Sequence, residues 1–261
     1  MIRRSMIAAL ALTFVAAYMA EAEFVKDGLV AYWNFETISN GNVVDALGGH
    51  DGAIEGNLDI DTGRVGNGLV FDGDGSYVNV DDPEGFDFEN QDYTWLAWIK
   101  TSAAGGSIFA KTPCGNADHA PGAKHLFVTG SLLTYDAGWV AGIAQTPVDD
   151  DEWHYVGVTM TLSTAGIVDT AQLYIDGEPD ISGDNDWNGQ KAAADQCVKI
   201  GYLNDNELGW TPPFDGIIDE VAIYDRALDA DEIMDNFVAE HRSVEPSEKL
   251  AETWGGLKVS R

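Results

Sequence analysis

Short β-type segments separated by glycine turns run through most of this 261-residue chain. Residues 77–80 are a representative β-rich segment, and Asp176-Gly177 is a strong two-residue hairpin signal. No apolar pattern of helical period is sustained between residues 24 and 226, so long amphipathic helices are not expected there. The pattern therefore predicts an all-β protein built mainly from antiparallel strands.

One carboxylate interrupts the most apolar of these segments, residues 214–224. Asp219 has the strand parity of Ile217, Val221 and Ile223, and alternate residues of a strand share a face. A buried carboxylate is costly unless it is paired, hydrogen-bonded or bound to a metal. Asp219 is therefore expected to lie in the core with a specific partner.

The N-terminal residues 1–22 have the features of a secretory signal peptide. Arg3 and Arg4 precede an apolar stretch over residues 6–20, and Ala20-Glu21-Ala22 is a small-x-small cleavage site. The apolar stretch is too short for a membrane-spanning helix. We expect a secreted, cell-surface or periplasmic protein whose mature form does not insert into a membrane, with an uncleaved anchor as the alternative.

Acidic residues greatly outnumber basic ones, 44 against 14, giving a formal net charge of −30. Nucleic acids and anionic membranes are bound through Lys and Arg, so neither is an expected partner. An excess of carboxylates does favour divalent cations.

The chain is expected to form one domain over residues 23–239, followed by a charged, Pro-interrupted tail over residues 240–261. A short helix is expected after Leu228, because Asp229 can cap it and Glu232 stands three positions later.

The two cysteines, Cys114 and Cys197, both lie in the expected mature chain. Export favours a disulfide between them, and two separate thiols are the alternative.

Seven segments in order resemble the laminin-G-like jellyroll domains of the concanavalin-A-like lectin and glucanase superfamily. They are GLVAYWNFE (28–36), VVDALGGHDGAIEG (43–56), GRVGNGLVFDGDGSYVNV (63–80), YTWLAWIK (93–100), EWHYVGVTM (152–160), AQLYIDGEP (171–179) and FDGIIDEVAIYDRALDADEI (214–233). The resemblance covers roughly residues 27–238 and implies an antiparallel two-sheet β-sandwich of jellyroll type.

The resemblance also implies a structural calcium. Glucanases of the superfamily bind calcium through the aspartate at the place of Asp219, and the matching segments offer Glu36, Asp72 and the Gly73 carbonyl as further ligands. The alternative is a buried Asp219 that accepts backbone N–H bonds.

A second calcium candidate is an Asp-rich stretch with the spacing of an EF-hand loop. Asp184, Asp186, Asn188 and Asp195 take positions one, three, five and twelve, with Gly189 at six. No helices are expected to flank this stretch, so a polar surface loop is the alternative.

The sequence does not predict an enzyme. The glucanases carry a Glu-x-Asp-x-(x)-Glu pattern that places two carboxylates on one strand face. Glu178 and Asp180 begin this pattern here, but Ser182 and Gly183 stand where the second Glu belongs. A glycoside hydrolase is therefore the least favoured function.

Three tryptophans in Gly-, Asn- and Pro-rich stretches are candidates for sugar binding, namely Trp139, Trp187 and Trp210. Exposed aromatic rings stack on sugars, although a loop tryptophan can equally close the end of a sandwich. We expect a non-enzymatic carbohydrate-binding or adhesion module for a neutral or cationic glycan. A protein–protein interaction domain of an extracellular assembly is the alternative.

Overall fold

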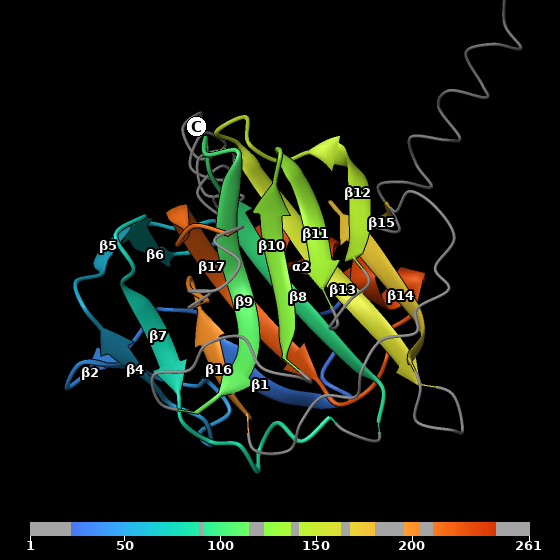
Figure 1. Cartoon of the computed structure of the whole chain (residues 1–261). Coiled ribbons are helices and arrows are strands. Elements are labelled where there is room, and N and C mark those ends of the chain that lie inside the picture. The colour runs from blue at the N-terminus through green and yellow to red at the C-terminus, as the bar shows by residue number, and fades with distance from the viewer. Residues whose placement is uncertain are drawn as a thin grey trace, which may run out of the picture.

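The computed structural model describes residues 22–88, 91–114, 123–136, 141–162, 168–180, 196–203 and 211–243. Two antiparallel sheets pack face to face within these ranges, with one helix on the outside (Figure 1). Among the described residues no helix is long and apolar enough to cross a membrane. The predicted antiparallel β-sandwich with a short C-terminal helix is confirmed.

The first sheet has eight strands in the order β15-β14-β13-β8-β17-β6-β5, with β1 also paired to β17. Their bounds are β1 Leu29–Trp33, β5 Asp59–Thr62, β6 Asn67–Asp72, β8 Tyr93–Lys100, β13 Trp153–Leu162, β14 Val168–Ile175, β15 Glu178–Pro179 and β17 Asp215–Tyr224. The Asp176-Gly177 turn joins β14 to β15, as the sequence predicts.

The second sheet has nine strands in the order β12-β11-β10-β9-β16-β7-β4-β3-β2. Their bounds are β2 Ile38–Ser39, β3 Asn42–Val43, β4 Gly52–Glu55, β7 Tyr77–Val80, β9 Gly105–Pro113, β10 Lys124–Thr129, β11 Leu132–Asp136, β12 Ala141–Pro147 and β16 Gln196–Ile200.

The main core lies between the two sheets and is built from alternate residues of their strands. On β8, Trp95 packs into this core, whereas Trp98 packs into a second cluster on the outer side of the sheet. An odd spacing of three residues places two side chains on opposite faces, so one strand serves both clusters.

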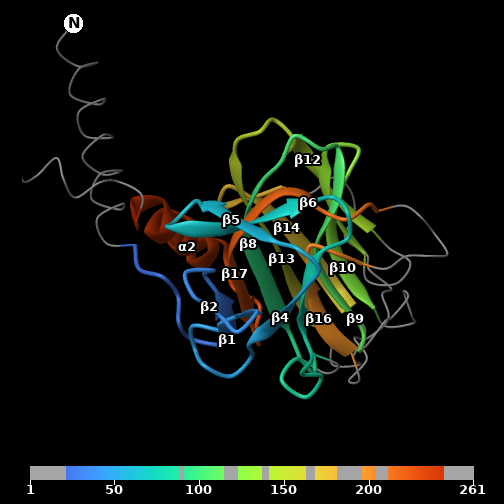
Figure 2. The same ribbon diagram turned by 90° about the vertical axis from the view of Figure 1, so that its left-hand side faces the viewer.

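Helix α2, Ala230–Ser243, covers the outer face of the eight-stranded sheet (Figure 2). Its predicted capping box is present: the Glu232 N–H donates to Asp229 Oδ1 at 2.9 Å, and the Asp229 N–H donates to Glu232 Oε2 at 3.0 Å. Ile233 and Phe237 pack the helix against Trp98. The helix thus converts an outer sheet face into a second core.

A β-bulge in β17 overturns part of the Asp219 prediction. The pairing of β17 with β8 shifts register between Asp219 and Ala222, and Glu220 has a left-handed φ of 51°. Asp219 lies opposite Trp98 and therefore shares its outer face, while Val221 lies in the core between the sheets. Asp219 is buried as predicted, but the prediction that it shares a face with Val221 and Ile223 is wrong.

Candidate functional site

Asp219 is fully buried beside the turn over residues 63–66. The Val65 N–H donates to its Oδ2 at 3.0 Å, and the Glu220 N–H donates to its Oδ1 at 2.8 Å. Burial raises the pKa of Asp219 to about 7, against the lowering effect of these N–H donors. Backbone donors therefore give Asp219 the partners that its burial requires.

Glu36 holds the same turn from another side. Its carboxylate accepts the Asn67 N–H at 2.7 Å and the Asn67 Nδ2 amide at 3.1 Å. A Cβ added at Gly63 would lie 2.4 Å from Asp219 Oδ2, and one added at Gly66 would lie 1.8 Å from Glu36 Oε1. Glycine at both positions is what lets the two carboxylates approach the turn.

Asp72 and Gly73 do not join Asp219 and Glu36. Asp72 ends β6 opposite Asp215, four residues along β17 from Asp219, which corresponds to about 13 Å of strand. The Gly73 N–H donates to the Phe214 carbonyl at 3.0 Å. The four ligands suggested by the resemblance therefore do not form one site. Since N–H donors already satisfy Asp219, calcium there stays a prediction.

The other predicted site residues lie outside the described part of the chain. These are Trp139, Trp187 and Trp210 for sugar binding and Asp184, Asp186, Asn188 and Asp195 for the second calcium. In chain order, Trp139 falls between β11 and β12, Trp187 between β15 and β16, and Trp210 between β16 and β17.

A buried acidic pair under α2 was not predicted from the sequence. Glu220 and Glu240 are 2% and 4% exposed, and Trp98 Nε1 donates to Glu240 Oε2 at 2.5 Å. Glu220 Oε2 and Glu240 Oε1 have no hydrogen-bond partner within the described ranges. Burial raises the pKa of Glu220 to about 8, and burial together with Glu220 raises the pKa of Glu240 further. The Arg64 guanidinium, 4.7 Å from the Trp98 ring centre, is a nearby cation.

The outer face of the nine-stranded sheet carries polar and aromatic side chains. Alternation with the core residues Val78, Val198 and Leu126 assigns this outer face. We call it the polar face, and among the described residues it includes Tyr77, Asn79, Ser107, Ala110, Thr112, His125, Phe127, Thr134, Asp136, Cys197 and Lys199.

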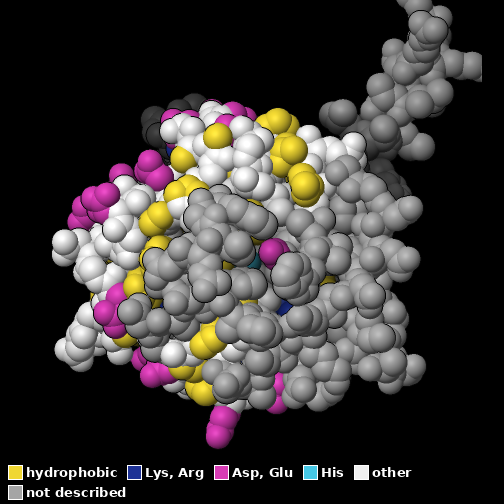
Figure 3. All heavy atoms as spheres, viewed as in Figure 1, with side chains coloured by type: hydrophobic (Ala, Val, Ile, Leu, Met, Phe, Trp, Pro, Cys, Tyr) yellow, Lys and Arg dark blue, Asp and Glu magenta, His cyan; other side chains and the backbone are white. Residues whose placement is uncertain are grey.

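A single cross-strand row runs over the polar face through five adjacent strands. Asn79 of β7 pairs with Lys199 of β16, which pairs with Ala110 of β9, then His125 of β10 and Asp136 of β11. Figure 1 views these strands from this side, and in Figure 3 acidic and basic side chains are visible near the centre of the same view. Apart from Ala110, the row places side chains with hydrogen-bonding groups in one line across the sheet.

The side chains in the middle of this row are shielded from solvent and are hydrogen-bonded. His125 Nε2 lies 2.8 Å from Ser107 Oγ, and Lys199 Nζ donates to Thr112 Oγ1 at 3.1 Å. Lys199 is only 2% exposed, and this burial lowers its pKa. These contacts fix the orientation of the polar groups.

One end of the row is more accessible and adds two aromatic rings. Tyr77 and Tyr202 are half-buried with ring centres 5.4 Å apart, and Lys199 Nζ lies 6.0 Å from the Tyr77 ring centre. Asn79 Oδ1 is buried with no hydrogen-bond partner in the described structure. We call Tyr77, Tyr202, Asn79 and Lys199 the tyrosine end. The sequence did not lead us to this group, although alternation in Tyr77-Val78-Asn79-Val80 places Tyr77 on the strand face opposite to the two valines.

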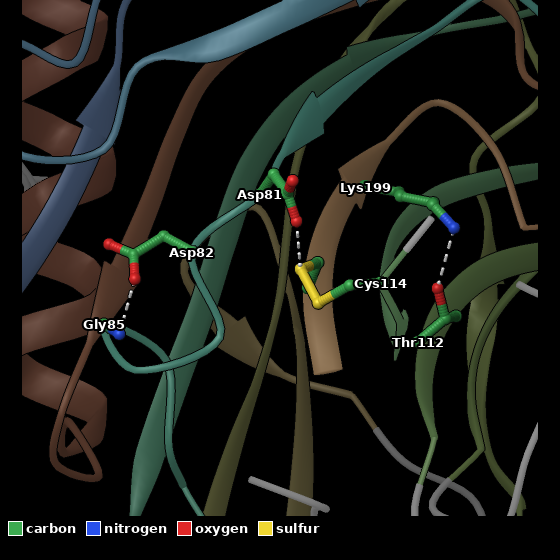
Figure 4. The surroundings of a disulfide bond; sticks show 7 residues. Asp81, Asp82, Gly85, Thr112, Cys114 and Lys199 are labelled. Carbon is green, nitrogen blue, oxygen red and sulfur yellow. Dashed lines mark hydrogen bonds between the residues drawn. A yellow bond between two sulfur atoms is a disulfide. The ribbon is translucent and has the colours of Figure 1, made fainter. Parts of the chain in front are cut away.

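A disulfide lies on the same outer face of the nine-stranded sheet. Cys114 and Cys197 are bonded, with their Cα atoms 4.9 Å apart (Figure 4). The predicted pairing is confirmed.

A cavity of about 510 Å³ lies elsewhere, between the N-terminal segment 22–26 and the end of α2. Phe24, Tyr32 and Glu240 contribute to its lining. It lies on the side of the molecule opposite to the polar face, since α2 covers the other sheet.

Comparison with known families supports the laminin-G resemblance. A laminin-G family model, described as the concanavalin A-like lectin/glucanases superfamily, matches residues 72–234. The chain belongs to this superfamily. No curated protein sequence matches the chain.

Several solved structures resemble the chain at low sequence identity. Domain 4 of AbnA, a GH43 extracellular arabinanase from Geobacillus stearothermophilus in complex with arabinotriose, has 22% identity and a TM-score of 0.59, covering 80% of this chain and 97% of that one. A Trypanosoma rangeli sialidase has 18% identity and a TM-score of 0.63, covering 85% of this chain and 35% of the sialidase. The binding domain of Paraclostridial Mosquitocidal Protein 1 has 16% identity and a TM-score of 0.57, covering 81% and 52%. At these identities the matches establish the fold.

Proposed function

We propose that this protein binds a glycan at the tyrosine end of its polar face and does not cleave it. The observation that carries the proposal is the pair of half-buried rings, Tyr77 and Tyr202, whose centres lie 5.4 Å apart at the accessible end of the polar face. Aromatic ring faces pack against the C–H faces of sugars.

The superfamily assignment supports this proposal, because the family description names lectins and glucanases. The AbnA domain, whose crystal contains arabinotriose, gives a precedent for a sugar bound to a domain of this fold. Several neighbours are domains of glycosidases, so a glycan-directed accessory role fits the fold as well as a free-standing lectin does.

A neutral glycan is the favoured ligand. Burial lowers the pKa of Lys199, so this side chain adds little positive charge that would attract an anionic ligand. The formal net charge of −30 opposes the approach of polyanionic glycans.

The non-enzymatic half of the proposal rests on access. Ser107 and His125 lie within hydrogen-bond distance and Asp136 lies opposite His125, which are the residue types of a hydrolytic triad. However, Ser107 is fully buried and His125 is 4% exposed, so a substrate cannot reach the hydroxyl in this conformation. We therefore assign these residues to holding the sheet face in shape.

The disulfide fits a protein that works outside the cytoplasm, and the expected signal peptide agrees with that location. We accordingly propose a secreted, cell-surface or periplasmic protein.

The test is calorimetric titration of the full chain with a panel of neutral oligosaccharides, arabino-oligosaccharides included. Tyr77→Ala and Tyr202→Ala should each weaken binding about 5–150-fold, as expected for loss of an aromatic contact of about 1–3 kcal/mol. Ile60→Ala, a truncation of an exposed side chain on the other sheet, is the matched control and should bind like the wild type.

Two outcomes would contradict the proposal. If both Tyr→Ala variants bind like the wild type, the tyrosine end is not the binding site. Trp139→Ala, Trp187→Ala and Trp210→Ala would then test the tryptophans suggested by the sequence. Release of shorter sugars from any bound oligosaccharide would contradict the non-enzymatic assignment.

A further inference from the structure

The cavity beside α2 has walls from both the N-terminal segment and the helix. Ala22 and Glu23 of the segment and Ala239 and Glu240 of the helix contribute to its lining. Glu240 is 4% exposed, and its Oε1 has no hydrogen-bond partner among the described residues. A buried carboxylate oxygen without a donor is costly, so a donor at this place would stabilise the fold.

The N-terminal segment is held against α2 close to this carboxylate (Figure 2). The Val25 N–H donates to Asn236 Oδ1 at 2.7 Å, and the Tyr224 hydroxyl donates to the Val25 carbonyl at 2.9 Å. These two contacts fix the backbone of the segment two residues after Glu23.

The Glu23 nitrogen is within reach of Glu240. Asn236 and Glu240 are four residues apart, so they lie on the same face of α2, separated by about 6 Å along its axis. The chain from Val25 back to Glu23 spans up to about 7 Å. Ala22, which is bonded to the Glu23 nitrogen, is buried and lines the cavity together with Glu240. The segment therefore runs towards this carboxylate.

Cleavage of the expected signal peptide changes the charge at this place. The small-x-small motif ends at Ala22, so cleavage makes Glu23 the first residue of the mature chain. Its peptide N–H then becomes an α-ammonium group, which is charged at neutral pH. Loss of Ala22 also frees a buried position in the wall of the cavity.

The surroundings of Glu240 favour a cation. Glu220 and Asp219 repel its carboxylate, and the Arg64 guanidinium attracts it. Glu240 also lies in the last turn of α2, where the helix dipole stabilises positive charge. One more positive group would balance the buried carboxylates.

We propose that the mature chain begins at Glu23 and that its N-terminal ammonium binds the Glu240 carboxylate in this cavity. The inference rests on the expected signal cleavage and is independent of the glycan site. The ammonium supplies the donor that Glu240 Oε1 lacks in the uncleaved chain. Because this carboxylate is buried in either case, the ion pair adds no new cost for burying it. Cleavage thereby fastens the start of the mature chain to the end of α2.

The experiment uses the full chain, expressed with its own leader and purified after export. Mass spectrometry identifies the first residue, and a mature chain that begins elsewhere than Glu23 overturns the proposal while leaving the glycan site untouched. The α-amine of the native protein is then acetylated at about pH 6.5, where most lysine side chains stay protonated. Peptide mapping follows the rate at the first residue.

Glu240→Gln tests the partner, since it removes the charge but keeps an oxygen that can accept the Trp98 N–H. The α-amine of the wild type should react at least about 10-fold more slowly than that of the variant, because the ion pair keeps it protonated. Lys26→Gln is the matched control: it removes a side-chain ammonium that also lines the cavity and should leave the wild-type rate unchanged. Equal rates in wild type and Glu240→Gln would overturn the proposal.

Urea unfolding of the acetylated chains gives a second measurement. Acetylation should raise the unfolding equilibrium constant of the wild type at least about 10-fold, since loss of one partner leaves a buried charge uncompensated. In Glu240→Gln, acetylation should have little effect on this constant. If acetylation leaves the wild-type constant unchanged, the ion pair is refuted whether or not the variant folds.

Discussion

Replacing Glu220 by Gln should change how the stability of this protein depends on pH. Burial raises the pKa of Glu220 from its ordinary value of 4.5 to about 8 in the folded chain. Between these values the folded chain keeps a proton that the unfolded chain loses. The stability contributed by this proton is therefore fully present below about pH 4.5 and is lost as the pH rises towards 8.

The size of the effect follows from proton linkage. One fully retained proton changes the free energy of unfolding by about 1.4 kcal/mol per pH unit. Allowing for structural relaxation around the buried pair, we expect Glu220→Gln to gain about 2–4 kcal/mol relative to wild type between pH 5 and pH 8. Removing the Glu220 charge should also lower the pKa of Glu240, since repulsion by Glu220 helps to raise it.

The assay is urea unfolding followed by tryptophan fluorescence at half-unit pH intervals from 5 to 9. Other groups also make the wild type lose stability over this range, including His154, whose pKa the Asp176 hydrogen bond raises. The difference between variant and wild type cancels these other groups and reports Glu220 together with its effect on Glu240. The matched control is Glu84→Gln, which makes the same substitution at an exposed carboxylate. A Glu220→Gln curve parallel to the wild-type curve would refute the reasoning.

Three further predictions concern the disulfide, the Asp219 turn and calcium. The double variant Cys114→Ala, Cys197→Ala should lose about 4–5 kcal/mol of unfolding free energy in the chain-entropy model, because the disulfide joins residues 83 positions apart. Guanidinium unfolding measures this loss, and a value under about 1 kcal/mol would contradict the model. Gly63→Ala should destabilise by several kcal/mol because its Cβ would lie 2.6 Å from the Asn67 backbone carbon, whereas Gly49→Ala, with nothing closer than 3.9 Å, should melt like the wild type. If calcium binds at Asp219 as the resemblance implies, excess chelator should lower the Tm of the wild type but not that of Asp219→Asn, and elemental analysis should find the ion; an unchanged Tm leaves the N–H donors as the partners of Asp219.

Local patterns in the sequence were sufficient to predict a chain of short strands and the features made by neighbouring residues, whereas the two-sheet sandwich was predicted from the family resemblance. The alternation of apolar and polar residues places Val78 and Val80 on the core face of their strand. The Asp229–Glu232 capping box depends only on two residues three positions apart. The cysteine count together with the signal sequence predicted the Cys114–Cys197 bond, because two thiols in an oxidising compartment have one possible intramolecular pairing.

Features that depend on the meeting of distant segments could not be read from the sequence. The acidic pair needs α2 to dock on β8, which brings Glu240 to Trp98 across 142 residues. The tyrosine end likewise needs Tyr77 and Tyr202, from separate parts of the chain, to come side by side.

Asp219 shows what the sequence alone determines and what only the tertiary structure determines. Its place in an apolar strand determined that it would be buried and would need a partner, and that much followed from the sequence. The bulge at Glu220 decided which face it occupies, and the packing of the turn over residues 63–66 decided that the partner is a set of backbone N–H groups. A bulge is a property of strand pairing, which residue alternation along one strand does not encode.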